Sequence, residues 1–263
     1  MKKFFSLLIA FAAFCAMGQH KEGCYIKKKD GSTISANSIT SNAAGDLTYE
    51  MGAVKVKSII KKKDYIFAWI PEPSVLKTAD AAMKKKDYDA ASKAYLKASE
   101  DYKYLGWYVY SIDMYGKTLF ELGKKDEAIK ALSVLNGYDV KDDKEETPLM
   151  EAYRTLASAY IDTAKYKEAE LVLKELEKAK NEDMAAYASI AGGDIAMKQG
   201  NKKDAALMYL QAVLLFPATN KERPLALCKA ANALKEINHP QAAKYADMLR
   251  KEYSSSPYVK ELK

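Results

Sequence analysis

Residues 187–217 read YASIAGGDIAMKQGNKKDAALMYLQAVLLFP. Apolar residues recur every three or four positions on both sides of Gly200, which is typical of two helices separated by a turn. Gly193 and Ala205 supply small side chains at the expected helix crossing, where they allow two antiparallel helices to approach closely. The stretch therefore predicts a hairpin of two closely packed helices.

The alanine of this hairpin has counterparts along most of the chain. Five equivalent alanines, spaced 37, 41, 36 and 37 residues apart, are Ala91, Ala128, Ala169, Ala205 and Ala242. A repeat of this length is typical of a solenoid, in which each unit is stabilised by stacking against its neighbours. Residues 74–263 are therefore predicted to form an α-solenoid of about five helical hairpins with a concave inner surface.

The residues around these alanines resemble the pattern of the tetratricopeptide repeat (TPR) family. An aromatic residue precedes Ala91 and Ala169 by three positions, at Tyr88 and Tyr166. The match is best around Ala205, where the family's positions are filled by Gly193, Gly200, Tyr209, Ala212 and Pro217. The departures, where family members usually carry an aromatic residue, are Lys125, Lys202 and His239. The resemblance implies a curved stack that recognises a partner protein on its concave surface.

The first residues have the features of a secretory signal peptide. Lys2 and Lys3 precede an apolar run, and small residues at Ala16 and Gly18 favour cleavage after Gly18. The apolar run is shorter than the ~20 residues of a membrane-spanning helix. We therefore expect residues 1–18 to be removed on export, which leaves a periplasmic or secreted protein without a transmembrane span.

Residues 19–70 contain the short, alternating apolar runs that are typical of strands. Asp30-Gly31 favours a tight hairpin, and residues 54–57 alternate between valine and lysine. Four or five short strands are expected, and their pattern resembles that of small SH3-like or Sm-like barrels. Residues 71–73 are interpreted as a linker, because proline cannot donate a hydrogen bond to a sheet.

Lysine runs make this small β module basic, within a chain of formal net charge +7. The predicted basic patch consists of Lys27, Lys28, Lys29, Lys61, Lys62 and Lys63. Such a patch attracts anionic glycan or lipid, but a patch of this size is also common as the solvated rim of a soluble module, and we favour the rim. No nucleic-acid partner is expected.

Two connections between predicted helices are longer than the others. The first, residues 101–106, lies in an aromatic run from Tyr102 to Tyr110 that includes Trp107, and we interpret this run as a secondary contact site. The acidic residues of the second, residues 138–148, are Asp139, Asp142, Asp143, Glu145 and Glu146. Because the second connection lacks the central glycine of an EF-hand, a solvated acidic loop is favoured over a calcium site.

The sequence lacks the usual motifs of enzymes. Its two histidines, His20 and His239, belong to no cluster of metal-ligating residues, and no phosphate-binding loop or nucleophile motif is present. Cys24 and Cys228 either form a disulfide or remain thiols, and free thiols are favoured. An enzyme that uses one of them is a disfavoured alternative, because neither has a histidine partner in sequence. A non-enzymatic protein without cofactor or metal is therefore predicted.

Projection of the first helix of each hairpin onto the concave surface predicts a partner-binding groove. Its residues are Tyr110, Asp113, Lys117 and Phe120 of the second hairpin, Glu151, Arg154, Ser158 and Ile161 of the third, and Tyr187, Ile190, Asp194 and Met197 of the fourth. Aromatic and aliphatic side chains flanked by charges suit an amphipathic segment of a partner protein. The leading hypothesis is an exported scaffold or adaptor that holds a partner protein in this groove. The alternative is a structural module of the cell envelope that adheres to anionic glycan or lipid through the basic patch.

Overall fold

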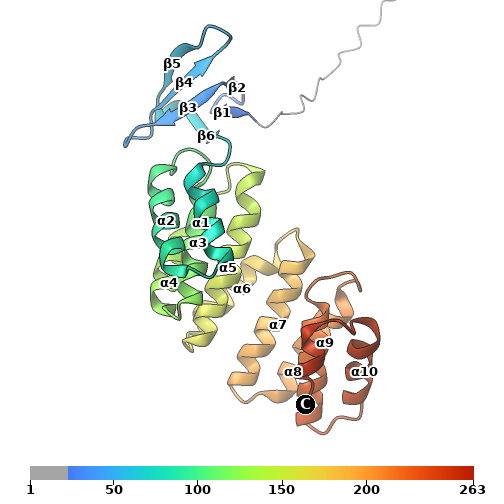
Figure 1. Cartoon of the computed structure of the whole chain (residues 1–263). Helices are drawn as coiled ribbons and strands as arrows, with labels where there is room; N and C mark the ends of the chain where they lie inside the picture. Colours follow the sequence, from blue (N-terminus) through green and yellow to red (C-terminus); the bar gives the residue numbers. More distant parts are fainter. Residues whose placement is uncertain (1–22) are drawn as a thin grey trace, which may run out of the picture.

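Two parts follow each other along the chain, a β module and a helical solenoid (Figure 1). The structure is a computed structural model that describes residues 23–263. The signal peptide predicted for residues 1–18 lies outside the described residues. Within residues 23–263, no helix combines the length and apolar character needed to cross a membrane.

The β module consists of two antiparallel sheets of three strands each, all within residues 24–69. In the first sheet the strand order is β2 (Thr33–Ala36), β1 (Cys24–Lys28) and β6 (Tyr65–Trp69). In the second sheet it is β3 (Ser38–Ser41), β4 (Leu47–Met51) and β5 (Val56–Ile60). The short 3-10 helix η1 (Lys62–Asp64) connects β5 to β6.

The hairpin predicted at Asp30-Gly31 joins β1 to β2. Lys27 pairs with Thr33 across it, and Gly31 has a φ of 84°, a left-handed conformation that glycine adopts without strain. The β module has six strands within the described residues, where four or five were expected. The additional strand is β3, in which Ile39 is the one buried residue, so its sequence shows no apolar alternation.

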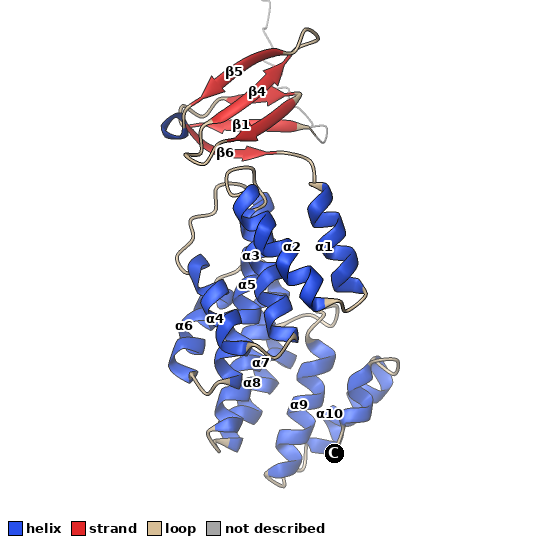
Figure 2. Ribbon diagram, turned by 60° about the vertical axis from the view of Figure 1, so that its left-hand side comes forward, coloured by secondary structure: helices blue, strands red, loops and turns tan. Residues whose placement is uncertain are grey.

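Residues 74–252 of the described chain form ten α-helices that pair into five hairpins (Figure 2). The hairpins are α1 (Ser74–Lys84) with α2 (Tyr88–Asp101), α3 (Tyr108–Glu121) with α4 (Lys125–Leu132), α5 (Asp143–Asp162) with α6 (Tyr166–Glu177), α7 (Glu182–Lys198) with α8 (Lys202–Leu215), and α9 (Arg223–Glu236) with α10 (Ala242–Glu252). The 3-10 helix η2 (Ser133–Leu135) extends α4, and η3 (Pro257–Glu261) follows α10. The predicted order of a small β module and five helical hairpins is confirmed.

Small residues lie in the interiors of these hairpins. A Cβ added to Gly116 of α3 would overlap Leu132 of α4, and one added to Gly193 of α7 would overlap Tyr209 of α8. Ala242, the first residue of α10, is half-buried. The other repeated alanines have no exposed surface, and they are Ala91, Ala128, Ala169 and Ala205. Small residues therefore permit the close approach that the sequence pattern predicts.

Successive hairpins stack because each first helix packs against the hairpin before it. α3 contacts α2, and α5 contacts both α3 and α4. One hydrophobic core extends from α3 to α7, and a second extends from α7 to α10. η3 packs against α9 and α10, the place that the first helix of another hairpin would take.

Candidate partner-binding face

The first helices of the five hairpins present one shared surface, which we call the inner face. Arg154 of α5 forms an ion pair of 2.7 Å with Glu222, the residue before α9. This pair joins the two helices on either side of α7, so α5 and α9 must curve toward each other over it. Such a contact between hairpins that are not neighbours is expected of a stack that curves toward this face.

A polar group that we call the Arg154 cluster lies on this face, and it consists of Arg154, Ser158, Tyr187 and Glu222. The Arg154 guanidinium lies 4.4 Å from the centre of the Tyr187 ring. The Tyr187 hydroxyl is 2.7 Å from the Ser158 hydroxyl and donates to the Arg154 carbonyl at 3.2 Å. Burial raises the pKa of Tyr187 to about 12, so its hydroxyl stays neutral. The Arg154 side chain keeps 32% of its surface exposed, which leaves the ordered guanidinium accessible.

Asp194 ties the fourth hairpin to the fifth on the inner face. It accepts a hydrogen bond of 2.6 Å from the hydroxyl of Tyr209, in its own hairpin. It also forms an ion pair of 2.6 Å with Lys229 of α9. Burial, together with the Asp194 carboxylate, raises the pKa of Tyr209 and keeps this tyrosine a donor.

The same arrangement recurs at Asp80 of α1. Its carboxylate accepts hydrogen bonds from Tyr95 of its own hairpin at 2.5 Å and from Tyr110 of the next hairpin at 2.8 Å. Tyr95 lies fifteen residues after Asp80, the same separation as between Asp194 and Tyr209. Two of the predicted groove residues, Tyr110 and Asp194, therefore also hold neighbouring hairpins together.

Asp113 is a buried carboxyl group on α3. It is 4% exposed, and within the described residues its Oδ1 has no hydrogen-bond partner. Burial raises its pKa to about 8, against the opposing charge of Lys117 and with a further contribution from Glu151 of α5. Asp113 is therefore mostly protonated at neutral pH and adds a neutral carboxyl group to this region.

The structure brings the predicted groove residues onto neighbouring first helices, but it does not expose all of them. Ile161 and Ile190 are 6% and 1% exposed and pack in the hydrophobic cores. Asp113 and Tyr187 are also buried. The half-buried members, which a partner can touch, are Tyr110, Lys117, Phe120, Glu151, Arg154, Ser158, Asp194 and Met197.

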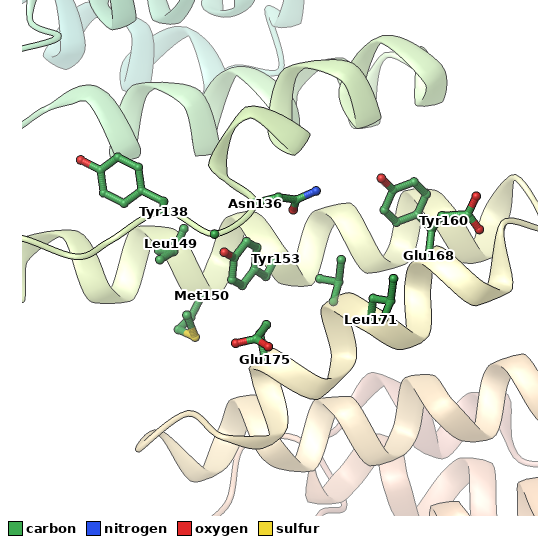
Figure 3. A pocket seen from close by; sticks show the side chains of 11 residues that line it. Asn136, Tyr138, Leu149, Met150, Tyr153, Tyr160, Glu168, Leu171 and Glu175 are labelled. Carbon is green, nitrogen blue, oxygen red and sulfur yellow. The ribbon is translucent and has the colours of Figure 1, made fainter.

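A cavity beside the second helices was not predicted from the sequence. It has a volume of about 570 Å³, and residues of α5, α6 and the segment after η2 line it (Figure 3). Leu171 at its rim is 65% exposed, and Leu207 at the same position of the next hairpin is 64% exposed. In the other three hairpins this position is occupied by Lys93, Lys130 and Lys244. Leucine at this position, where the other repeats have lysine, is the feature of the sequence that indicates an apolar surface beside the second helices.

The first long connection holds the β module against the solenoid. Trp107 packs on Trp69 of β6 with ring centres 4.6 Å apart, and its indole N–H donates to the Ile70 carbonyl at 3.0 Å. Gly106 approaches β6 so closely that an added Cβ would overlap Trp69. Trp107 and Gly106 of the aromatic run therefore belong to an intramolecular interface, and the interpretation of the run as a secondary contact site stays a prediction.

The second long connection also contacts the β module, and we call the contact of both long connections with the β module the β-module interface. Asp142 accepts a hydrogen bond of 2.8 Å from Tyr25 of β1 and forms an ion pair of 2.7 Å with Lys27. Burial alone would raise the pKa of Asp142, but hydrogen bonds from Lys27, the Lys144 amide and Tyr25 hold it below its ordinary value. Glu145 is 3% exposed and accepts hydrogen bonds from within the connection. The buried carboxylates of this connection, Asp142 and Glu145, therefore stabilise the structure through hydrogen bonds and an ion pair. Within residues 23–263, no group of three potential metal ligands lies together.

Most of the basic patch is engaged in contacts within the chain. Its ion pairs are Lys27–Asp142, Lys28–Asp30 and Lys61–Asp46, with distances of 2.7, 2.7 and 2.8 Å. Lys62 lies 4.4 Å from the centre of the Tyr65 ring. Lys29 and Lys63 are exposed. These pairings reduce the charge that the patch presents to an anionic surface.

Both cysteines of the described chain, Cys24 and Cys228, are free and buried, so the expected free thiols are confirmed. Burial raises the pKa of each thiol. This disfavours the thiolate, which is the reactive form.

No protein-family model matches this chain, and no curated protein matches it. Among solved structures, the crystal structure of MamA aligns with a TM-score of 0.51 and 21% identity, over 67% of this chain and 95% of MamA. The apo form of RapI aligns with a TM-score of 0.57 and 14% identity, over 72% of this chain and 56% of RapI. Rap protein complexed with competence and sporulation factor gives a TM-score of 0.55 and 15% identity, over 72% of this chain and 56% of that chain. These neighbours are TPR-type proteins, so the helical part has a TPR-type fold.

Proposed function

We propose that this chain is a non-enzymatic, exported adaptor of the TPR family that binds a segment of a partner protein on its inner face. The Arg154 cluster carries the proposal, because it holds a half-buried guanidinium over an aromatic ring on a concave surface. Such a group suits a carboxylate or an aromatic side chain of a partner. The complex of Rap with competence and sporulation factor supports ligand binding by proteins of this fold.

The non-enzymatic part of the proposal rests on how the titratable groups are used. Asp80 and Asp194 are satisfied by hydrogen bonds and ion pairs between neighbouring hairpins. Cys24 and Cys228 are buried thiols of raised pKa. Groups engaged in packing in this way are not placed to transfer protons to a substrate or to attack it.

Photo-cross-linking in the native host tests the partner site. A benzophenone amino acid replaces Lys117 on the inner face, and in a matched control it replaces Lys174, an exposed residue of α6. We expect an adduct of one defined mass from position 117 and none from position 174. An adduct from position 174 alone, or none from either position, would contradict the proposal.

Export is tested by the mass of the protein recovered from the cell envelope or the medium. The proposal expects a chain that begins at Gln19, because small residues at Ala16 and Gly18 favour cleavage there. A chain that retains residues 1–18 and stays in the cytoplasm would remove the exported part of the proposal.

A further inference from the structure

After α10 the chain turns back and packs against α9 and α10. Residues 257–263, which we call the strap, comprise η3 and the two residues after it. Asn232 of α9 holds the strap backbone on both sides of Leu262: its amide N–H donates to the Glu261 carbonyl at 2.9 Å, and its carbonyl accepts from the Lys263 N–H at 2.9 Å. A side-chain amide that satisfies both a carbonyl and an N–H recognises a main chain rather than one particular side chain.

Charged side chains of α9 add to this contact at the end of the strap. Lys235 donates from its ammonium group to the backbone oxygen of Lys263 at 2.7 Å. Glu236 forms an ion pair with the Lys263 side chain, and hydrogen bonds from Lys263 and Lys202 hold the pKa of Glu236 below its ordinary value. This part of α9 is therefore matched to a backbone oxygen and a basic side chain.

Apolar side chains of the strap add to its contact with the solenoid. Tyr258, Val259 and Leu262 are half-buried against the core that α7 to α10 share. Burial raises the pKa of Tyr258, and the charges of Glu222 and Arg154 act on its hydroxyl. The strap therefore covers part of the surface of the last two hairpins.

The strap is held less firmly than the helices. Within residues 74–263, every α-helix contributes at least two buried side chains, whereas the strap contributes none. Segments with few buried contacts open at a small fraction of the global free energy of unfolding. A segment held through its backbone and by half-buried side chains can exchange with a similar segment from another chain.

We propose that the strap is an internal ligand of α9, one of the first helices that form the inner face, and that the partner binds by replacing it. The partner segment then carries an aromatic residue, an aliphatic residue four positions later and a basic residue directly after that, in the places of Tyr258, Leu262 and Lys263. This inference rests on the proposed function and adds to it the chemistry of the partner.

The test uses a double variant of the full chain, Tyr258→Ser with Leu262→Ser, in which the contacts of the strap are weakened. The probe is a fluorescent peptide with the sequence of residues 256–263, SPYVKELK. We expect this double variant to bind the peptide at least about tenfold more tightly than the unmodified chain, because a tethered strap competes at an effective concentration in the mM range. Fluorescence anisotropy measures the binding.

Two controls accompany this measurement. In the first, the double variant should bind a peptide with the same two serines, SPSVKESK, at least about tenfold more weakly than SPYVKELK. In the second, Asn232→Ala is added to the double variant, which should then bind SPYVKELK at least about tenfold more weakly. Equal peptide binding by the double variant and the unmodified chain, or binding unaffected by Asn232→Ala, would overturn the inference.

Circular dichroism shows whether the double variant keeps its helices. If it does not, trypsin digestion of the unmodified chain decides: cleavage after Lys260 in the strap is expected at least about tenfold faster than within α9 or α10. Equal rates would make the strap an integral part of the fifth hairpin and overturn the inference. If the strap fails these tests while position 117 still cross-links a partner, the proposed function stands without it.

Discussion

The β-module interface and the inner face use the same kinds of side chain, aromatic rings and charged groups, but they differ in exposure. In the interface, the Asp142 side chain is 6% exposed in its ion pair with Lys27. On the inner face, Asp194 is 30% exposed in its pair with Lys229. The interface is closed because two long connections fold over the β module, whereas the strap that packs on α9 contributes no buried side chain. Aromatic and charged residues therefore indicate a partner site only where the fold leaves them accessible.

The largest effect is expected from opening the closed region. Trp107→Ala removes the packing on Trp69 and the hydrogen bond to Ile70. We expect this to weaken the contact between the β module and the solenoid by about 3 to 4 kcal/mol. The β module should then unfold at a lower temperature than the solenoid in differential scanning calorimetry. Trp107→Phe, which keeps an aromatic ring, should lose less. An unchanged single transition for Trp107→Ala would show that the two regions are not coupled as described.

A gain in stability is expected at Asp113. Its pKa in the folded chain is about 8, above the unfolded value of ~3.9, so its contribution is favourable below pH ~4 and is lost as the pH rises toward 8. Asp113→Asn removes this loss, so the gain in the free energy of unfolding should be larger at pH 8 than at pH 5 by about 3 to 4 kcal/mol. Urea unfolding at both pH values measures it. The same gain at both values would argue against a raised pKa.

The opposite pH dependence is expected at Asp142. Its pKa in the folded chain is below its ordinary value, so its stabilising effect is present above pH ~3.9 and is lost as the pH falls through the folded pKa. Asp142→Asn should cost about 1 to 2 kcal/mol at pH 7, and the difference from the unmodified chain should shrink as the pH falls below ~3.9 and through the folded pKa. Thermal unfolding between these pH values provides the measurement. A constant difference would show that the carboxylate charge does not matter to the interface.

A smaller effect on stability, but a large one on binding, is expected on the inner face. Arg154→Ala leaves Glu222 without its ion pair and should cost about 1 kcal/mol in the free energy of unfolding. It should also reduce the yield of the partner adduct from position 117 severalfold. Lys174→Ala, on the exposed side of α6, is the matched control and should change neither quantity. Equal adduct yields from both variants would remove the Arg154 cluster from the partner site.

The smallest effect is expected from the exposed part of the basic patch. Substituting Lys29 and Lys63 by alanine should change the free energy of unfolding by less than about 0.5 kcal/mol. Co-sedimentation with vesicles that contain anionic lipid should be weak at about 0.15 M salt and unchanged by the substitutions. Strong, salt-sensitive retention that these substitutions abolish would instead favour the β module as a surface-binding element.

The solenoid could be predicted because close helix packing leaves a local pattern in the sequence. Gly193 and Ala205 are needed where α7 and α8 approach, and the pattern recurs in every hairpin. The strand β3 could not be predicted in this way, because Ile39 is its one buried residue. The helical projection brings Arg154 of α5 and Tyr187 of α7 to the same side, and their side chains are in contact in the structure. It could not show that Ile190 turns into the core, because that depends on where the next helix packs.

The contacts that join distant segments left no such pattern. Tyr25 and Asp142 lie 117 residues apart, and neither occupies a position whose neighbours identify the other. Asn232 binds the Lys263 N–H of the strap from 31 residues away, and its hydrogen bonds to the strap involve backbone atoms only. The β-module interface and the strap can therefore be recognised only from the three-dimensional arrangement. The length of the two connections is the one sequence feature that indicates the β-module interface.

Hydrogen exchange measured by mass spectrometry on the unmodified chain tests the difference between the two regions most directly. Amide groups of the strap are expected to exchange at least about tenfold faster than those of α9 and α10, while residues 102–107 and 138–145 of the β-module interface stay as protected as the helices beside them. Rapid exchange in both long connections together with slow exchange in the strap would contradict the account.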